Sequence, residues 1–240
     1  MTAGFAAFLL CGVTFAGEPA SQPGAASLPG TGLEPRATGA SFVLRTDDTT
    51  LALSVNADQQ LLLRELSSPA GWNWTTEPSV FPLLGRVDVA GVQVSPAWTL
   101  VSSDLVQDNG KDSILTMLFA CTDPPLELKS VWQAHCGPGP VHVAMCVTNK
   151  SDRSVTIFEQ ESLDGCIAWP GEDTSVWYIR DDGGIPDATG VYHDQLAEQY
   201  RKELGISEGE DYIPLAVVDA GGAHGVYFGW EWSIGRMTIA

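Results

Sequence analysis

Short segments in which apolar and polar residues alternate run through the sequence from Ser41 onward. In TLALSVNAD, the side chains of Leu51, Leu53 and Val55 fall on one side of an extended chain, as in a strand with one buried face. Similar segments follow at short intervals, separated by turn sequences such as CGPGP and NKSDRS. Many short strands at this spacing predict antiparallel sheets packed as a sandwich or barrel, rather than βαβ units.

Two of these segments carry more detail. In LVQDNGKDSILTMLFA, Asn109-Gly110 separates two strand-like runs, which is a strong hairpin signal. In PVHVAMCVTN, one face of the predicted strand holds Val141, Val143, Met145 and Val147, and the other holds His142, Ala144, Cys146 and Thr148. The remaining strand-like segments are FVLRTD, LLLREL, VDVAGVQV, LELKSVWQAH and SVTIFEQESL.

One stretch departs from the period of two. In YHDQLAEQYRKELGI, Leu196, Tyr200 and Leu204 are spaced i, i+4 and i+8, which predicts either a short amphipathic helix near residues 193–204 or a compact loop. We expect the only appreciable helix of the fold here. Strand-like sequence then resumes and continues into RMTIA at the end of the chain. We therefore expect the sandwich to be incomplete and the chain to be a fragment.

The first 40 residues differ in composition from the rest. GFAAFLLCGVTFA is an apolar run of signal-peptide length with a small-residue cleavage site at Thr14-Phe15-Ala16, although no Lys or Arg precedes it. It is too short to span a membrane. Residues 17–40 are mainly Gly, Pro, Ala and Ser and predict a flexible linker. The sequence thus predicts a signal peptide (1–16), a linker (17–40), one β-sandwich domain (41–240), and export to the periplasm or the cell exterior.

The charge and the cysteine content limit which partners, metals and cofactors are expected. The formal net charge is −18, from 30 acidic and 12 basic side chains, so the surface repels nucleic acid and anionic lipid. This charge either indicates a neutral partner or, as we favour, serves solubility alone. The four cysteines beyond the leader form either disulfides, in one of three pairings, or free buried thiols: Cys121, Cys136, Cys146 and Cys166. Their spacing fits no zinc pattern and the four histidines are scattered, so we expect neither metal nor cofactor.

The stretch YFGWEWSIGR contains the strongest candidate binding residues. In a strand, Trp230 and Trp232 lie on one face and Glu231 on the other. Two such indoles make a flat apolar platform on which a sugar ring stacks, while a carboxylate hydrogen-bonds hydroxyl groups. The other interpretation, which the sequence alone favours, is that both indoles fill the sandwich core.

Two other stretches are weaker candidates. Arg180, Asp181 and Asp182 offer paired carboxylates of the kind that hydrolyse glycosides, but Asp-Gly is ordinary turn chemistry, which we favour. Trp72 and Trp74 form either a contact surface in a loop or a loop folded back over the sandwich. Asn73 and Asn149 begin glycosylation sequons. The sequence shows no complete catalytic apparatus.

Three long stretches resemble the N-terminal β-supersandwich domain of glycoside hydrolase family 36, the α-galactosidases. They are TLALSVNADQQLLLREL, GPVHVAMCVTNKSDRSVTIFEQESLDGCIAWP and YIPLAVVDAGGAHGVYFGWEWSIGRM. The resemblance implies an all-β, galactose-mutarotase-like supersandwich that precedes a (β/α)8 barrel. In that family both catalytic aspartates belong to the barrel, one of them in a Lys-Trp-Asp motif. This sequence contains no Trp-Asp pair, so no catalytic residue can be assigned.

The resemblance also implies a function. We expect the N-terminal sandwich domain of an exported α-galactosidase-like hydrolase, which shapes the sugar pocket and supports a downstream barrel. Trp230, Glu231 and Trp232 are the expected substrate-binding residues, and a carbohydrate such as an α-galactoside is the expected partner. The alternative is a non-catalytic carbohydrate-binding or adhesion module of an exported protein.

Overall fold

The computed structural model describes residues 4–10, 39–69, 72–81, 83–107, 112–157, 168, 174–181, 190–207, 210–221, 224–230 and 236–239. All regular elements in these residues are strands, as the alternating pattern predicts. They are β1 (Gly4–Leu10), β2 (Ser41–Arg45), β3 (Thr50–Val55), β4 (Leu61–Ser67), β5 (Ser79–Val80), β6 (Val87–Val89), β7 (Val92–Val94), β8 (Thr99–Gln107), β9 (Ser113–Cys121), β10 (Leu126–Ala134), β11 (Val141–Asn149), β12 (Val155–Ile157), β13 (Ser175–Asp181), β14 (Gly190–Gln195), β15 (Lys202–Ser207), β16 (Glu210–Asp219), β17 (His224–Trp230) and β18 (Arg236–Ile239).

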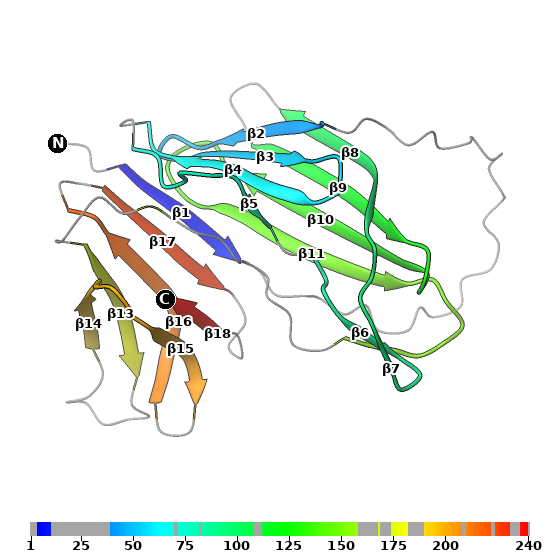
Figure 1. Ribbon diagram of the computed structural model, residues 1–240. Coiled ribbons are helices and arrows are strands. Elements are labelled where there is room, and N and C mark those ends of the chain that lie inside the picture. The colour runs from blue at the N-terminus through cyan, green and yellow to red at the C-terminus, as the bar shows by residue number, and fades with distance from the viewer. Residues whose placement is uncertain are drawn as a thin grey trace.

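The first part of the fold, which we call the N-terminal sandwich, comprises β2 to β12. A four-stranded sheet in the order β2-β3-β4-β5 packs on the antiparallel strands β8 to β11 of the largest sheet (Figure 1). The three side chains predicted to share the buried face of β3, Leu51, Leu53 and Val55, are at most 2% exposed. In β11, Val141 and Val143 are buried and His142 between them is half-buried, as the predicted alternation requires, whereas Met145, Cys146 and Val147 are all half-buried and no longer alternate.

The core of this sandwich lies between the two sheets. Trp132 of β10 is fully buried and meets Phe81, which follows β5, edge to face with ring centroids 4.8 Å apart. Leucines of β2 and β3 and apolar residues of β9 complete the layer. Burying an aromatic or leucine side chain contributes roughly 1.5–3 kcal/mol each, so these contacts supply much of the stability of this part. A small sheet, β12-β6-β7, stands beside it.

The second part, which we call the C-terminal sheet, comprises β13 to β18. Its strands run in the order β14-β13-β16-β17, all antiparallel, with β15 pairing with the start of β16 and with β18. The inner side chains of β13 and β16 are buried, among them Val176, Tyr178, Ala216 and Val218.

Strand β1 joins the two parts into one sheet of eleven strands. All seven of its residues pair with β17, and Phe8 to Leu10 also pair with the start of β11. Both pairings are parallel, whereas every other strand pair is antiparallel among the described residues. Figure 1 shows β1 between the sandwich and the C-terminal sheet.

The helix predicted near residues 193–204 is wrong. These residues form the end of β14, a turn at residues 198–199 and the start of β15, and the described residues contain no helix. The apolar spacing nevertheless reflects burial, because Leu196 is 7% exposed and Leu204 is fully buried. A tight turn between two strands returns both leucines to the core, which is the compact-loop alternative.

Several predicted features lie partly or wholly outside the described residues. Strands β8 and β9 form the predicted hairpin, with Gln107 opposite Ser113, while Asn109-Gly110 lies outside the described residues. Most of the predicted linker also lies outside them. Cys121, Cys136 and Cys146 are free thiols, and Cys166 is not among the residues described.

Candidate functional site

The stretch with the predicted substrate-binding residues lies at the end of β17. The backbone of Trp230 is the last of the strand and lies opposite Leu10 of β1, and the preceding Gly229 lies opposite Leu215 of β16. The Trp230 side chain, Glu231 and Trp232 lie outside the described part of the chain, which resumes with β18. The stretch therefore connects β17 to β18, and its role in binding stays a prediction.

The acidic pair of the second candidate lies at the end of β13. Arg180 pairs with Tyr212 and Asp181 with Asp211 of β16, after a register shift between Tyr178 and Arg180. The Asp181 side chain and Asp182 lie outside the described part of the chain. Asp181 is thus a strand residue at the edge of the turn that the sequence predicts.

The tryptophan loop folds back onto the molecule. Trp74 is 1% exposed, and its ring lies 5.9 Å from that of Trp72 in an edge-to-face contact. Trp72 in turn packs against His224, at 5.1 Å between ring centroids. This confirms the folded-back alternative for Trp74. The loop therefore contacts the start of β17, at the opposite end of that strand from Trp230.

Among the described residues, three nitrogens in this ring cluster have no hydrogen-bond partner. They are Trp72 Nε1, Trp74 Nε1 and His224 Nδ1, and all three are buried. Buried polar groups are normally satisfied by protein or by ordered water. The cluster therefore has capacity for a further hydrogen bond at the junction between the N-terminal sandwich and β17.

A polar network, which the sequence does not predict, crosses the inner face of the C-terminal sheet. Asp194 of β14 accepts hydrogen bonds from the hydroxyls of Tyr178, at 3.3 Å, and Tyr200, at 2.9 Å. Lys202 Nζ donates to the Tyr178 hydroxyl at 2.9 Å, lies 3.5 Å from Asp194 Oδ2, and stands 4.3 Å from the Tyr178 ring centroid. Tyr212 meets the Tyr178 ring edge to face at 5.7 Å.

This network changes the acidity of its members. Burial and the hydrogen bond to Asp194 raise the pKa of the Tyr200 hydroxyl. Burial disfavours the charge on Lys202, but the hydrogen bond to Tyr178 and the neighbouring negative potential outweigh it and raise the pKa of this amine. Both groups therefore hold their protons firmly at neutral pH. These raised pKa values suit hydrogen bonds that hold the strands together rather than proton transfer, because neither pKa lies near 7.

Sequence reasoning missed this network because its members come from four separate strands. Asp194, Tyr200 and Lys202 all belong to the stretch whose spacing predicts a helix, which hides their placement on two strands and a turn. A signal was nevertheless present, since the hydroxyls of Tyr178, Tyr200 and Tyr212 need hydrogen-bond partners when these side chains are buried.

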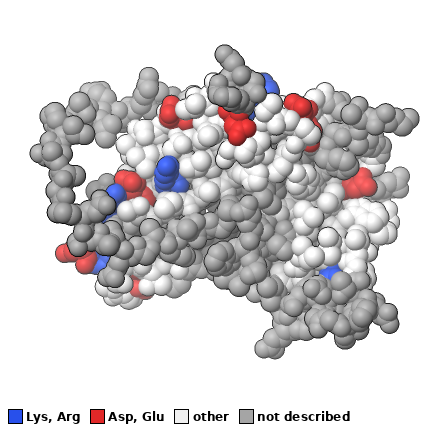
Figure 2. Space-filling model, turned by 180° about the vertical axis from the view of Figure 1, so that it is seen from behind, with Lys and Arg blue, Asp and Glu red and all other residues white. Residues whose placement is uncertain are grey.

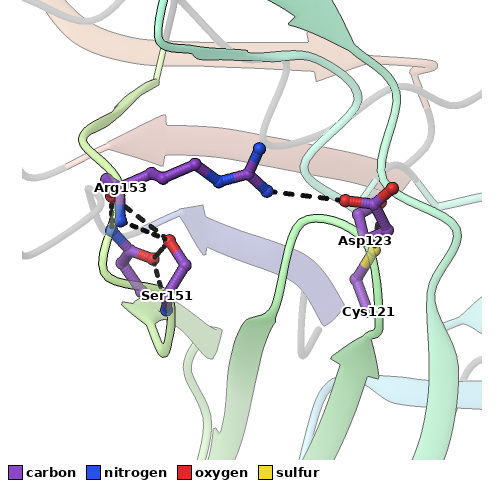
Figure 3. Close-up of polar contacts among 5 residues, drawn as sticks. Cys121, Asp123, Ser151 and Arg153 are labelled. Atoms are coloured by element: carbon purple, nitrogen blue, oxygen red, sulfur yellow. Dashed lines mark hydrogen bonds and ion pairs between the residues drawn. The ribbon is translucent and has the colours of Figure 1, made fainter.

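The second sequon lies in the turn after β11. The Asn149 side-chain carbonyl accepts hydrogen bonds from the Ser151 backbone N–H, at 2.9 Å, and hydroxyl, at 2.7 Å, and its amide donates to the Arg153 carbonyl at 2.8 Å. Figure 3 shows Arg153 reaching from this turn to Asp123, 3.6 Å away. Both of these side chains are exposed, so their ion pair contributes little to stability.

The charged groups do not form a continuous basic surface on the face shown in Figure 2. Its few Lys and Arg side chains stand apart from one another and alternate with acidic ones. Among the residues described, no group of His, Cys, Asp and Glu is placed to hold a metal ion, and no helix is long and apolar enough to cross a membrane.

Comparisons of sequence find no relative. No protein-family model matches the chain, and no curated protein matches it. Comparison of structures does find similar proteins, all at low identity.

A substituted form of the GH36 α-galactosidase AgaA from Geobacillus stearothermophilus, in complex with raffinose, matches with a TM-score of 0.56 and 10% identity. The galactosidase domain of the α-galactosidase–sucrose kinase AgaSK matches with 0.54 and 13%, and the α-galactosidase from Lactobacillus brevis with 0.53 and 13%. Each match covers 76% of this chain.

Each match covers a much smaller share of the α-galactosidase than of this chain. This chain spans 31–32% of the length of these structures, which is consistent with the sandwich domain expected from the sequence. At 10–13% identity the likeness concerns the fold. The chain therefore has the all-β supersandwich fold found in the GH36 α-galactosidases.

Proposed function

We propose that the chain as a whole is the N-terminal β-supersandwich domain of an α-galactosidase-like glycoside hydrolase. The observation that carries this proposal is the fold likeness to several α-galactosidases over 76% of the chain, one of them bound to raffinose. The absence of a Trp-Asp pair agrees with a domain that supplies no catalytic aspartate and acts beside a barrel. The proposed substrate is an α-galactoside.

In this proposal the end of β17 helps to shape the sugar pocket. Trp230, Glu231 and Trp232 follow strand β17 at the point where the chain turns towards β18. Indoles there bind the apolar face of a galactose ring and the carboxylate binds hydroxyls. Strand β17 supports this end through its antiparallel pairing with β16, which extends to Gly229.

The experiment begins with the coding sequence beyond Ala240. A downstream barrel with a Lys-Trp-Asp motif is the expected result. The longer protein should hydrolyse an aryl α-galactoside, and the 240-residue chain should not. A stop codon after Ala240 would overturn the proposal, and so would hydrolysis by the 240-residue chain that is lost on Asp181→Asn.

The role of the stretch at the end of β17 is tested in the longer protein. Trp230→Ala and Trp232→Ala should raise KM for the galactoside by about tenfold, the loss expected for one aromatic contact. Glu231→Gln should have a smaller effect in the same direction. Trp98→Phe, in the N-terminal sandwich, is the control. Unchanged KM in all three variants would remove these residues from the pocket.

We further propose that the protein is exported, with cleavage after Ala16. The apolar run and its small-residue cleavage site support this. Residues 4–10 also form β1, so cleavage removes a strand that β11 and β17 otherwise pair with. N-terminal sequencing of the secreted protein tests the proposal: a chain that begins at Gly17 supports it, and a chain that retains Gly4 contradicts it.

A further inference from the structure

The outer face of the C-terminal sheet carries exposed apolar side chains. Trp177 of β13, Val191 of β14 and Ile213 of β16 are 36%, 65% and 43% exposed. They occupy odd-numbered positions, which point away from the buried residues Val176 and Tyr178. We call this surface the Trp177 face; it also includes His193, Ser175 and Gln195, which occupy odd positions of β13 and β14.

An aromatic pair stands at the centre of this face. Trp177 lies directly opposite His193 on the neighbouring strand, and their rings stack at 4.4 Å between centroids with planes 30° apart. On its other side Trp177 lies opposite Val217 of β16. The indole is therefore fixed between two neighbours, which lowers the entropy lost when a ligand stacks on it.

A polar row runs beside the aromatic row. Gln195 pairs with Ser175, and Ser175 pairs with Asp219, so these three residues cross the same three strands one step along the sheet. Neighbouring strands are about 4.8 Å apart, so the two rows extend over roughly 10 Å. Amide, hydroxyl and carboxylate groups next to a flat apolar strip are the pattern that binds polyhydroxylated rings.

Charge favours a neutral ligand on this face. The aromatic row carries no Lys, Arg, Asp or Glu, and the chain as a whole has a net charge of −18, which repels polyanions. An apolar protein surface as the partner would leave the polar groups of the second row to be desolvated, which costs free energy.

We propose that the Trp177 face binds a neutral oligosaccharide chain, with the Trp177–His193 pair stacking on a sugar ring and the Gln195–Ser175–Asp219 row binding hydroxyls. This inference goes beyond the proposed function, because it concerns the outer face of the sheet, needs no barrel and holds for the 240-residue chain. Binding here attaches the protein to a polysaccharide rather than presenting a bond for cleavage.

The test is affinity electrophoresis of the full chain in gels that contain soluble galactomannan, dextran or xyloglucan. The wild-type protein should be retarded by at least one of the three. Trp177→Ala should weaken that retardation about tenfold in Kd. Trp177→Tyr, which keeps an aromatic ring, should retain most of it, and Gln195→Ala should lie between these variants.

Val92→Ala is the matched control, because Val92 is 63% exposed on β7, in a different sheet. Thermal melts of every variant establish that the fold is intact, and His193→Ala replaces Trp177→Ala if that variant fails to fold. Wild-type protein that migrates equally in all gels would overturn the proposal. So would Trp177→Ala that binds like wild type, or sedimentation showing that the face joins two copies of the chain. None of these results depends on hydrolysis, which tests the proposed function separately.

Discussion

The N-terminal sandwich and the C-terminal sheet are stabilised by different kinds of contact. In the sandwich, two sheets cover each other and the space between them is filled by apolar side chains such as Phe81 and Trp132. In the C-terminal sheet, one face is open at Trp177, and the inner face is held by a hydrogen-bonded network around Asp194. A second apolar layer makes stability insensitive to pH, whereas a polar network makes it depend on protonation.

The largest expected effect is in the sandwich. Trp132→Ala removes a fully buried indole and its contact with Phe81, and should lower the free energy of unfolding by about 3–5 kcal/mol. Urea denaturation followed by tryptophan fluorescence measures it. Val106→Ala, on an exposed position of β8, is the control and should change little. A loss below about 1 kcal/mol for Trp132→Ala would show that this core is loosely packed.

A smaller effect is expected in the C-terminal sheet. Asp194→Ala leaves the hydroxyls of Tyr178 and Tyr200 without their shared acceptor, and should cost about 1–2 kcal/mol because the carboxylate is partly exposed. Amide hydrogen exchange should accelerate in β14 and β15 but not in β3. Asp152→Ala, in an exposed turn, is the control. Equal acceleration in both parts would show that the molecule unfolds as a single unit.

Alkaline pH should destabilise the C-terminal sheet before the N-terminal sandwich, without any mutation. The pKa values of Tyr200 and Lys202 are raised in the folded protein, so their contribution to stability is complete below pH 10 and is lost as pH rises towards their folded values. Circular dichroism and exchange measurements between pH 9 and pH 12 should show the C-terminal sheet loosening first. Tyr200→Phe should reduce this dependence, and a dependence identical to wild type would assign it to other tyrosines.

The smallest effect on stability is expected for Asp112, at the exposed end of the N-terminal sandwich. The backbone N–H of Cys136 and the side chains of His135 and Gln133 lower the pKa of Asp112. Its contribution is present above the ordinary carboxyl pKa and is lost as pH falls. Asp112→Asn should leave the melting temperature at pH 7 unchanged within error and slightly flatten the fall of stability below pH 4. A clear drop at pH 7 would mean that this surface pair matters more than its exposure implies.

The contrast between the two parts also explains what the sequence predicts. In β3 and β11, alternation follows from a sheet with one buried face, so Leu51 and Val141 could be placed from the pattern. At Leu196 and Leu204, a spacing of eight fits both a helix and two strands joined by a turn, and the short turn at residues 198–199 leaves no sequence signal strong enough to decide. Tertiary context decides between these alternatives.

Other features depend on contacts between distant residues, which periodicity does not reveal. The network around Asp194 joins four strands, and the Trp72–His224 contact joins residues about 150 positions apart. The stretch that follows β17 illustrates the opposite case: its composition indicates what Trp230 and Trp232 are suited to bind, while the strand register places only the end of β17.

The parallel strand β1 also sets an order of events during synthesis. Residues Gly4 to Leu10 are synthesised before all the other described strands, yet they pair with β17, which is made after nearly all of those strands. Contacts of such long range form slowly and late. The N-terminal sandwich can therefore close its apolar core while the first segment is still unpaired.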